Sequence, residues 1–385
     1  MKTKNKYEFF SIFIFCGFLL FFFLLIIVNP KKEFSENEKR KLATPPKINL
    51  NTIKNSSLGV EIEKYFSDHF FNREFFIGTF SYANLAIGRN GQSGIYKGKD
   101  DYLIEKPAKN NEQNFIKNIK TINKFIESFE KINAKIMLVP TTGFIMENKL
   151  PLLHETYQDD FTFKILEKEV KGKINNIDLI KTFKDNCNNK QIFYKTDHHW
   201  TYHGAFLAYK KYCEECKITY IDEKNFLYNN FGYFWGTTYS KSALWLSKPD
   251  IMETLTPKDS NNFKVIVKDL AEEKIHNGLL FEEYFNKNND KYSIFTGSNN
   301  GFTIVENNSI NNSTSTDKSL LIIKDSFANS LVPFLINHYK KIYLLDPRYY
   351  KKSISNIIRQ DKIQNILILY SVKNIAADTN IVLIK

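Results

Sequence analysis

The sequence predicts an α/β fold, a three-layer domain with a mostly parallel sheet flanked by helices, together with one N-terminal transmembrane helix. Short apolar runs such as 320–323 and 366–369 have the length and composition of strands covered on both faces. Amphipathic stretches of helical period alternate with these runs, as they do in parallel α/β sheets. A predominantly apolar stretch of twenty residues without a charge, Phe9 to Val28, predicts the membrane helix.

The N-terminal apolar stretch is long enough to cross a bilayer, and Lys2, Lys4 and Lys6 precede it. A cleaved signal peptide normally has a shorter apolar region and a site of small residues, which 26–30 lacks. We therefore expect residues 1–29 to be an uncleaved anchor in the cell membrane. The lysine balance favours a cytoplasmic N-terminus and an extracytoplasmic remainder.

A charged tether at 30–52, carrying Pro45 and Pro46, leads into one predicted domain at 53–385. The regular spacing of Phe115, Ile119, Ile122, Ile126 and Phe129 predicts an amphipathic helix. In chain order we expect a helical stretch at 58–86, a hairpin through 94–96 and 102–104, this helix at 115–129 and a strand at 134–139.

The second half of the domain repeats the α/β pattern around a less regular region. Residues 220–317 read as an insertion rich in loops, of which 307–317 is nearly all Asn, Ser and Thr. Pro333 would disrupt a helix starting at Ser326, so we expect an irregular turn there first. The expected elements are a helix at 201–216, a strand at 320–323, a helix at 332–339, a strand at 341–345, a helix at 353–359 and a strand at 365–369.

Two compact motifs supply an acid, a base and a nucleophile. A serine is a poor nucleophile unless an imidazole takes its proton and a carboxylate orients that imidazole. In an extended segment side chains alternate faces, so Asp197 and His199 point the same way and His198 points away. We predict a catalytic set of Ser326, His199 and Asp197 that carries out acyl transfer.

The Asp-His-His-Trp element at 197–200 and the Asp-Ser-Phe-Ala-Asn-Ser run at 325–330 resemble the signatures of the DHHW proteins. This SGNH-hydrolase-like group of the bacterial envelope is similar in turn to the alginate O-acetylation proteins. Its relatives carry an Asp-x-His pair ahead of the nucleophilic serine, the order found here. Further matching stretches are 34–40 with Leu42, 68–70 with Arg73, and 98–103.

The resemblance implies a membrane-anchored, extracytoplasmic O-acetyltransferase or acetylesterase that acts on a cell-envelope polysaccharide and needs no cofactor. It also implies a multi-pass membrane acyltransferase as the partner that supplies acetyl groups. The sequence does not separate transfer from hydrolysis, because both pass through the same acyl-enzyme. The alternative is a non-catalytic protein on the same fold that binds envelope polysaccharide or assists assembly.

The sequence offers further candidate residues for the site of Ser326, His199 and Asp197. Gly297 and Asn299 are predicted oxyanion donors, and the alternative for them is an ordinary turn. Trp235 and Tyr239 are candidates for stacking on sugar rings, and the alternative is that both side chains pack in the core. Two further substrate-binding candidates are Lys241 and Arg348.

A metal site is the competing mechanism, since Asp197, His198, His199 and His203 lie within seven residues. Thr201 suits a helix N-cap, which would leave His199 outside the helix and break its spacing with His203, so no metal is expected. The Cys213 and Cys216 pair has redox or metal spacing, but an incidental or structural pair is the default, and a disulfide stays open.

The formal net charge of +12 comes from lysines spread along the chain rather than gathered in a stripe. A nucleic-acid partner would need such a stripe, so none is expected. Anionic lipid headgroups or an acidic wall polymer fit a diffuse positive field better.

Overall fold

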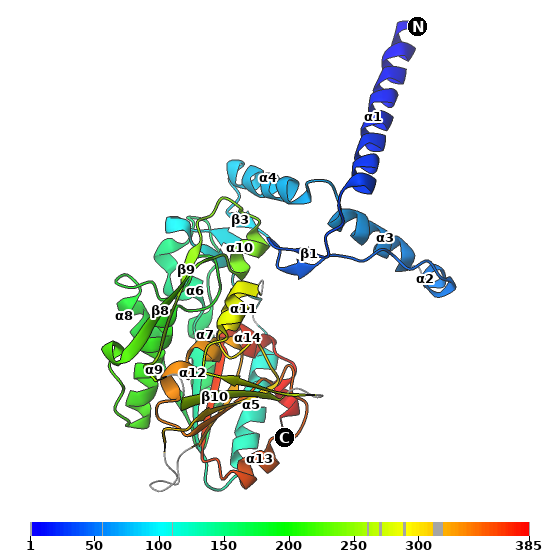
Figure 1. Cartoon of the computed structure of the whole chain (residues 1–385). Helices are drawn as coiled ribbons and strands as arrows, with labels where there is room; N and C mark the ends of the chain where they lie inside the picture. The colour runs from blue at the N-terminus through cyan, green and yellow to red at the C-terminus, as the bar shows by residue number, and fades with distance from the viewer. Residues whose placement is uncertain are drawn as a thin grey trace. The chain divides into compact units, whose positions relative to one another are not determined.

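The computed structural model describes residues 2–55, 57–109, 111–259, 262–268, 272–287, 290–310 and 319–384 (Figure 1). The chain forms two compact units, one of Met1–Ser93 with Tyr239–Leu246 and one of Gly94–Thr238 with Ser247–Lys385. Whether residue 53 begins a separate folding unit, as the sequence predicts, stays a prediction.

The larger unit is built on an eight-stranded sheet with the order β11-β10-β12-β14-β13-β15-β6-β7. Its strands are β6 (Asn133–Val139), β7 (Ile174–Ile177), β10 (Phe263–Lys268), β11 (Glu273–Asn277), β12 (Phe302–Asn307), β13 (Ser319–Lys324), β14 (Lys341–Leu345) and β15 (Asn365–Ser371). The five strands from β14 to β7 run parallel, whereas β12, β10 and β11 add antiparallel neighbours at one edge. The predicted α/β fold class is confirmed.

Helices cover both faces of this sheet, and the side chains of β13 pack into a separate hydrophobic core on each face. Leu320 and Ile322 belong to one buried cluster, and Leu321 and Ile323 belong to the other. Both faces of the strand are therefore buried, which is why its sequence is continuously apolar. The first cluster includes side chains from α6 (Thr142–Ile145), α8 (Ile180–Asn186), α9 (Tyr202–Cys216) and α12 (Val332–Leu335). The second includes side chains from α5 (Glu112–Glu127), α7 (Asp159–Glu169), α13 (Ser355–Gln360) and α14 (Val372–Ala377).

Most elements expected from the sequence are present. The strands at 134–139, 341–345 and 365–369 correspond to β6, β14 and β15, and the helix at 201–216 corresponds to α9. The hairpin pairs β4 (Ile95–Lys97) with β5 (Leu103–Glu105). After Ser326 comes the predicted irregular turn, a 3₁₀ turn at Ser326–Ser330, and Pro333 lies in the first turn of α12. That helix ends at Leu335, earlier than predicted.

Residues 220–317, expected to be rich in loops, carry several strands in their described part. β8 (Phe226–Phe234) pairs with β9 (Asp250–Pro257), and β10, β11 and β12 extend the main sheet. A short helix, α11 (Glu282–Lys287), follows β11. Polar residues interrupt β11, whose side chains are mostly exposed, so it lacks the apolar run that marks a central strand. The predicted loop at 307–317 lies mainly outside the described residues.

The smaller unit contains α1 (Lys2–Val28), β1 (Phe34–Ser35), β2 (Arg40–Lys41), α2 (Leu50–Lys54), α3 (Ser57–Asp68), α4 (Arg73–Ala86) and β3 (Gly91–Gln92). The predicted helical stretch at 58–86 is present as two helices, because Asn72 adopts a left-handed conformation with φ of 53° and separates α3 from α4. Arg40 donates hydrogen bonds from Nη1 and Nη2 to the two carboxylate oxygens of Asp68, which connects β2 to the end of α3.

The stretch Tyr7–Val28 of α1 is long and apolar enough to cross a membrane. A signal sequence near the N-terminus has the same properties, so α1 is a membrane anchor or a signal sequence.

Asp325 holds the end of β13 to the end of β15. Its carboxylate is fully buried, and Oδ2 accepts hydrogen bonds from the Ser371 N–H at 2.8 Å, the Ser371 hydroxyl at 2.9 Å and the Asn374 amide at 2.8 Å. Oδ1 accepts from the Phe327 N–H at 3.0 Å. These bonds fix the turn that carries Ser326.

We expect Asp325→Ala to lower the free energy of unfolding by about 3 kcal/mol, because several buried donors lose a charged acceptor together. Chemical denaturation of the purified protein measures the change. The control is Glu130→Gln at an exposed site, expected to shift stability by less than about 0.5 kcal/mol. An Asp325→Ala protein as stable as this control would contradict the role given to Asp325.

Candidate active site

Ser326 lies where parallel α/β sheets place their sites, just past the carboxyl end of a central strand. β13 ends at Lys324, and Ser326 opens the 3₁₀ turn that follows. The Asp325 side chain caps this turn by accepting the Phe327 N–H. Ser326 is buried, with 6% of its surface exposed.

Asp197 and His199 lie in the loop between the isolated bridge residue Phe193 and the start of α9. His199 Nδ1 is 2.6 Å from Asp197 Oδ1, and His199 Nε2 is 2.7 Å from Ser326 Oγ. Asp197 and His199 are each only 4% exposed. The three residues predicted to act together thus form one buried hydrogen-bonded chain.

The Asp197 carboxylate is held by its own loop and by a second loop. Oδ1 also accepts the His199 N–H at 2.9 Å, and Oδ2 accepts the Thr237 N–H at 2.7 Å and its hydroxyl at 3.0 Å. A Cβ at Gly236 would overlap the Asp197 side chain, so only glycine fits there. Thr237 and Gly236 were not predicted as site residues.

The Asp197 carboxylate is stabilised in its ionised form. Burial raises the pKa of this carboxyl, but the neighbouring charges of His198 and His199 and the hydrogen bonds from His199 and the Thr237 N–H lower it more. The net result is a pKa well below the usual value for an aspartate. Asp197 can therefore serve as a permanent anion beside His199 Nδ1.

Both faces of the His199 ring are flanked by aromatic rings. Tyr292 stacks on it with centroids 3.7 Å apart and planes at 3°, and the His198 ring is 3.9 Å away at 37°. The Tyr292 hydroxyl hydrogen-bonds to Ser330 Oγ at 2.8 Å, which also accepts from Trp200 Nε1 at 2.7 Å. Tyr292 comes from the region expected to be loop-rich, and no signal in the sequence pointed to it.

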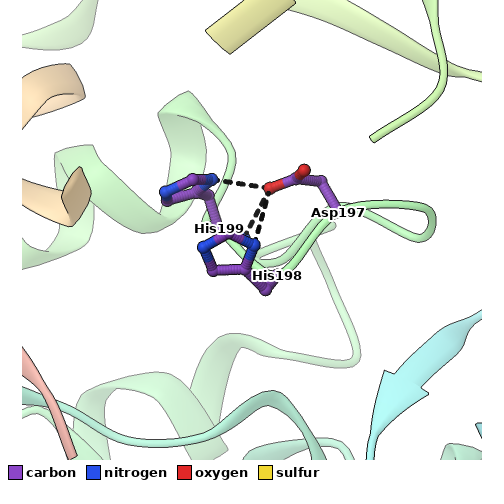
Figure 2. Close-up of side chains that lie close together, drawn as sticks. All are labelled: Asp197, His198 and His199. Carbon is purple, nitrogen blue, oxygen red and sulfur yellow. Dashed lines mark hydrogen bonds and ion pairs between the residues drawn. The ribbon is translucent and has the colours of Figure 1, made fainter. Parts of the chain in front are cut away.

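His198 lies against the same Asp197 oxygen as His199, as Figure 2 shows, so the prediction that His198 points away is wrong. Its Nδ1 is 2.6 Å from Thr237 Oγ1 and 3.6 Å from Asp197 Oδ1. Asp197, His198 and His199 each offer one ligand atom, all within 4.8 Å of one another, and so form a candidate metal site. Both His199 nitrogens are hydrogen-bonded, so a metal ion there would replace the contact to Asp197 or to Ser326.

The other residues considered as metal ligands lie outside this group. His203 is on α9, with Nδ1 4.0 Å from a Glu223 carboxylate oxygen. Cys213 and Cys216 are free thiols, and Cys213 is buried. Burial raises the pKa of both thiols, which does not favour the reactive thiolate form.

The predicted oxyanion residues lie in a loop with unusual backbone geometry. Thr296, Gly297 and Ser298 all have positive φ, at 56°, 73° and 92°. Asn299 Oδ1 is 3.4 Å from the side-chain amide of Asn329, which belongs to the turn that starts at Ser326. The loop is thus connected to that turn, and the oxyanion role of Gly297 and Asn299 stays a prediction.

A buried lysine supports the same turn. Lys324 is 2% exposed, and its Nζ donates to Asn329 Oδ1 at 2.7 Å. Burial lowers the pKa of Lys324 to about 8, although the Asp346 carboxylate favours the charged form. Sequence reasoning did not single out this residue.

The aromatic candidates for sugar stacking differ in exposure. Trp235 is 39% exposed, and its Nε1 donates to the Ser247 carbonyl at 3.0 Å. Tyr239 is 7% exposed and packs against Trp245 with ring centroids 5.1 Å apart. The Tyr239 ring is therefore not open to a sugar, which corrects the idea of a two-residue platform, whereas a stacking role for Trp235 stays a prediction.

The two basic candidates for substrate binding differ in exposure and in the partners they already have. Lys241 is exposed and lies on α10 (Thr237–Ser242). Arg348 is half-buried, and it donates hydrogen bonds to the Asp346 carboxylate from Nε at 2.9 Å and from Nη2 at 2.7 Å. Much of the Arg348 donor capacity is thus already used within the protein.

The Asp197→Asn substitution is expected to lower the free energy of unfolding by about 2 kcal/mol at pH 7, because the lowered pKa of Asp197 makes its ionised form a stabilising one. That contribution is complete above the pKa of an unfolded aspartate, about 3.9, and is lost as the pH falls toward the lower folded value. The stability gap between wild type and Asp197→Asn should therefore shrink between about pH 4 and pH 2.

Denaturant midpoints at pH 7, 5 and 3 would measure this gap, with Asp160→Asn at an exposed position of α7 as the matched control. A gap that widens in acid would contradict the stated electrostatics.

Two family models match the chain. Residues 162–345 match the DHHW protein family, and residues 95–228 match a model described as an SGNH hydrolase-like domain, acetyltransferase AlgX. Both matches include Asp197 and His199, and the first also includes Ser326. The resemblance predicted from the motifs is confirmed.

Solved structures with a similar fold include a DHHW family protein from Eubacterium siraeum, 20% identical, with a TM-score of 0.62, covering 76% of this chain and 95% of that one. PatB1 of Bacillus cereus, solved with a sulfonyl adduct, is 23% identical, with a TM-score of 0.61, covering 76% of this chain and 98% of that one. At these identities the likeness shows the fold. Among curated proteins no sequence matches.

Proposed function

From this DHHW-family region on an SGNH hydrolase-like fold, we propose that the protein is a serine O-acetyltransferase or acetylesterase acting on a cell-envelope polysaccharide. The observation that carries the proposal is the chain of hydrogen bonds from Asp197 through His199 to Ser326. The match of residues 95–228 to a family described as an acetyltransferase supports the choice of acyl group.

In the first half-reaction, Ser326 Oγ attacks the carbonyl carbon of an acetyl ester and its proton passes to His199 Nε2. Asp197 accepts a hydrogen bond from the Nδ1–H of His199, which keeps Nε2 free as the base and stabilises the imidazolium that forms. The ester oxygen then leaves with the proton from His199. The products are acetyl-Ser326 and a free alcohol.

In the second half-reaction, an acceptor hydroxyl gives its proton to His199 Nε2 and attacks the acetyl carbon. Ser326 recovers the proton when the acetyl group departs. If the acceptor is a sugar hydroxyl, the product is an O-acetylated sugar, and if it is water, the product is acetate. A multi-pass membrane acyltransferase is the proposed source of acetyl groups for the transfer reaction.

The proposed location is the cell membrane, with α1 as an uncleaved single span and the folded units on the extracytoplasmic side. The length and composition of Tyr7–Val28 support a span, and Lys2, Lys4 and Lys6 before it support a cytoplasmic N-terminus. An envelope polysaccharide would then be within reach of Ser326.

Turnover of an aryl acetate by the purified full-length protein tests the mechanism. Ser326→Ala and His199→Ala should each lower kcat/KM by about 10³-fold or more, because nucleophile and base act as a unit. Ser128→Ala, at an exposed site on the C-cap of α5, should leave it unchanged. Chelator should have no effect, and a loss of activity restored by added zinc would favour the metal reading of Asp197, His198 and His199.

Labelling with a fluorophosphonate separates an enzyme from a binding protein, since only an activated serine reacts quickly. Mass spectrometry should find the adduct on the peptide that contains Ser326 in wild type, and little or none in folded His199→Ala. A folded wild-type protein that stays unlabelled would argue for the non-catalytic envelope-binding alternative.

A further inference from the structure

The exposed face of α4 carries several large apolar side chains beyond the charged residues that begin the helix. Phe75, Phe76, Phe80 and Ile87, here called the α4 aromatic face, are 58%, 45%, 55% and 72% exposed. No charged residue occurs in the sequence from Phe75 to Gly88. A run of large exposed rings on one helix marks an interaction surface.

The inner face of α4 is small and polar, the reverse of a soluble surface helix. Gly78, Ser81 and Asn84 are its buried residues, and a Cβ at Gly78 would overlap the Trp245 ring. Trp245 Nε1 donates to the Glu74 carbonyl at 2.9 Å. Helix α4 thus turns its polar side to the protein and its aromatic side outward.

The neighbouring helix α3 serves as an internal comparison, because its exposed positions include Glu63 and Lys64. The absence of charge on the α4 aromatic face is therefore a property of that helix and not of the whole unit.

Ring contacts join the α4 region to the apolar helix α1. Phe22 stacks on Phe70 with centroids 5.4 Å apart and planes at 8°, and it lies 6.4 Å from Phe76 edge to face. Phe23 lies 6.3 Å from Phe66. Phe22 precedes the end of the apolar helix at Val28 by six residues, or about 9 Å of helix rise.

This depth has a consequence for α4. If α1 crosses the bilayer up to Val28, rings that touch Phe22 lie at the depth of Phe22, inside the boundary of the apolar layer. Interfacial helices bury their apolar face by about 5–10 Å, which agrees with this depth. Aromatic side chains are also the ones that membrane interfaces favour.

We propose that the α4 aromatic face lies in the lipid of the membrane leaflet next to the folded units, as a second membrane contact beside α1. The inference rests on the proposed function only in that α1 is taken to span the membrane. Lys32, exposed just after the span, is placed for an anionic headgroup, whereas Lys31 donates to the Ile26 carbonyl. Cleavage after α1 would uncover Phe70 and Phe76, so the packing favours an anchor over a signal sequence.

Tryptophan quenching by brominated phosphatidylcholine tests the proposal on the full chain in lipid nanodiscs. Phe80→Trp reports on the α4 aromatic face, Phe13→Trp on the middle of α1 and Glu63→Trp on the charged face of α3. The emission of the three native tryptophans, measured on the unsubstituted protein, is subtracted. Each replacement is at an exposed position, so the fold is kept.

We expect a loss of emission for Phe80→Trp similar to that for Phe13→Trp, and little loss for Glu63→Trp. Quenching of Phe13→Trp with Phe80→Trp unquenched would overturn the inference and leave the anchor standing. Emission from Phe80→Trp that is blue-shifted but unquenched would also overturn it, because a protein surface such as a second copy would then cover the face. If Phe13→Trp is unquenched, the anchor and the inference fail together.

Discussion

The buried negative charge of Asp197 is the constraint on which the candidate site depends. A carboxylate taken out of water is tolerated only where hydrogen bonds and opposite charge replace its hydration. Here the His199 ring and N–H and the Thr237 N–H and hydroxyl supply those partners. Satisfying this one charge therefore fixes the 197–199 loop, the Gly236–Thr237 pair and the orientation of the His199 ring together.

A second buried aspartate does the same for the other half of the site. Asp325 accepts hydrogen bonds from the end of β15 and from the turn after β13, so Ser326 is held by the central sheet. His199 and Ser326 are 127 residues apart in sequence. Each is located by its own network, and Ser326 Oγ and His199 Nε2 meet where the two networks adjoin.

The parts of this structure that the sequence predicts are those with a local physical signal. β13 can be predicted because both its faces are buried. The Asp197–His199 contact was predicted from strand alternation, but residues 195–199 form bends and His198 lies against the same carboxylate. The sequence does not predict the contacts that Tyr292 and Thr237 make in the site, because these contacts are with segments distant in the chain. For Tyr239 the sequence left sugar stacking and core packing open, since an aromatic run has the same composition in a core and on a surface, and the structure shows burial.

The antiparallel edge formed by β10, β11 and β12 and the separation of α3 from α4 show two other limits. A half-exposed edge strand carries polar residues that weaken its pattern, and β11 is such a strand. The break between α3 and α4 depends on the backbone of Asn72, which asparagine tolerates without requiring it.

The stack of Tyr292 on His199, with His198 close to the other face, has a consequence for the order of events in the proposed reaction. A ring held on both sides cannot swing between two groups, so Nε2 serves Ser326 Oγ and one further oxygen position. The departing alcohol and the incoming hydroxyl must use that position in turn. Release of the first product before entry of the acceptor is the order that an acyl-enzyme requires, and the packing of the three aromatic rings would keep Nε2 in place for both steps.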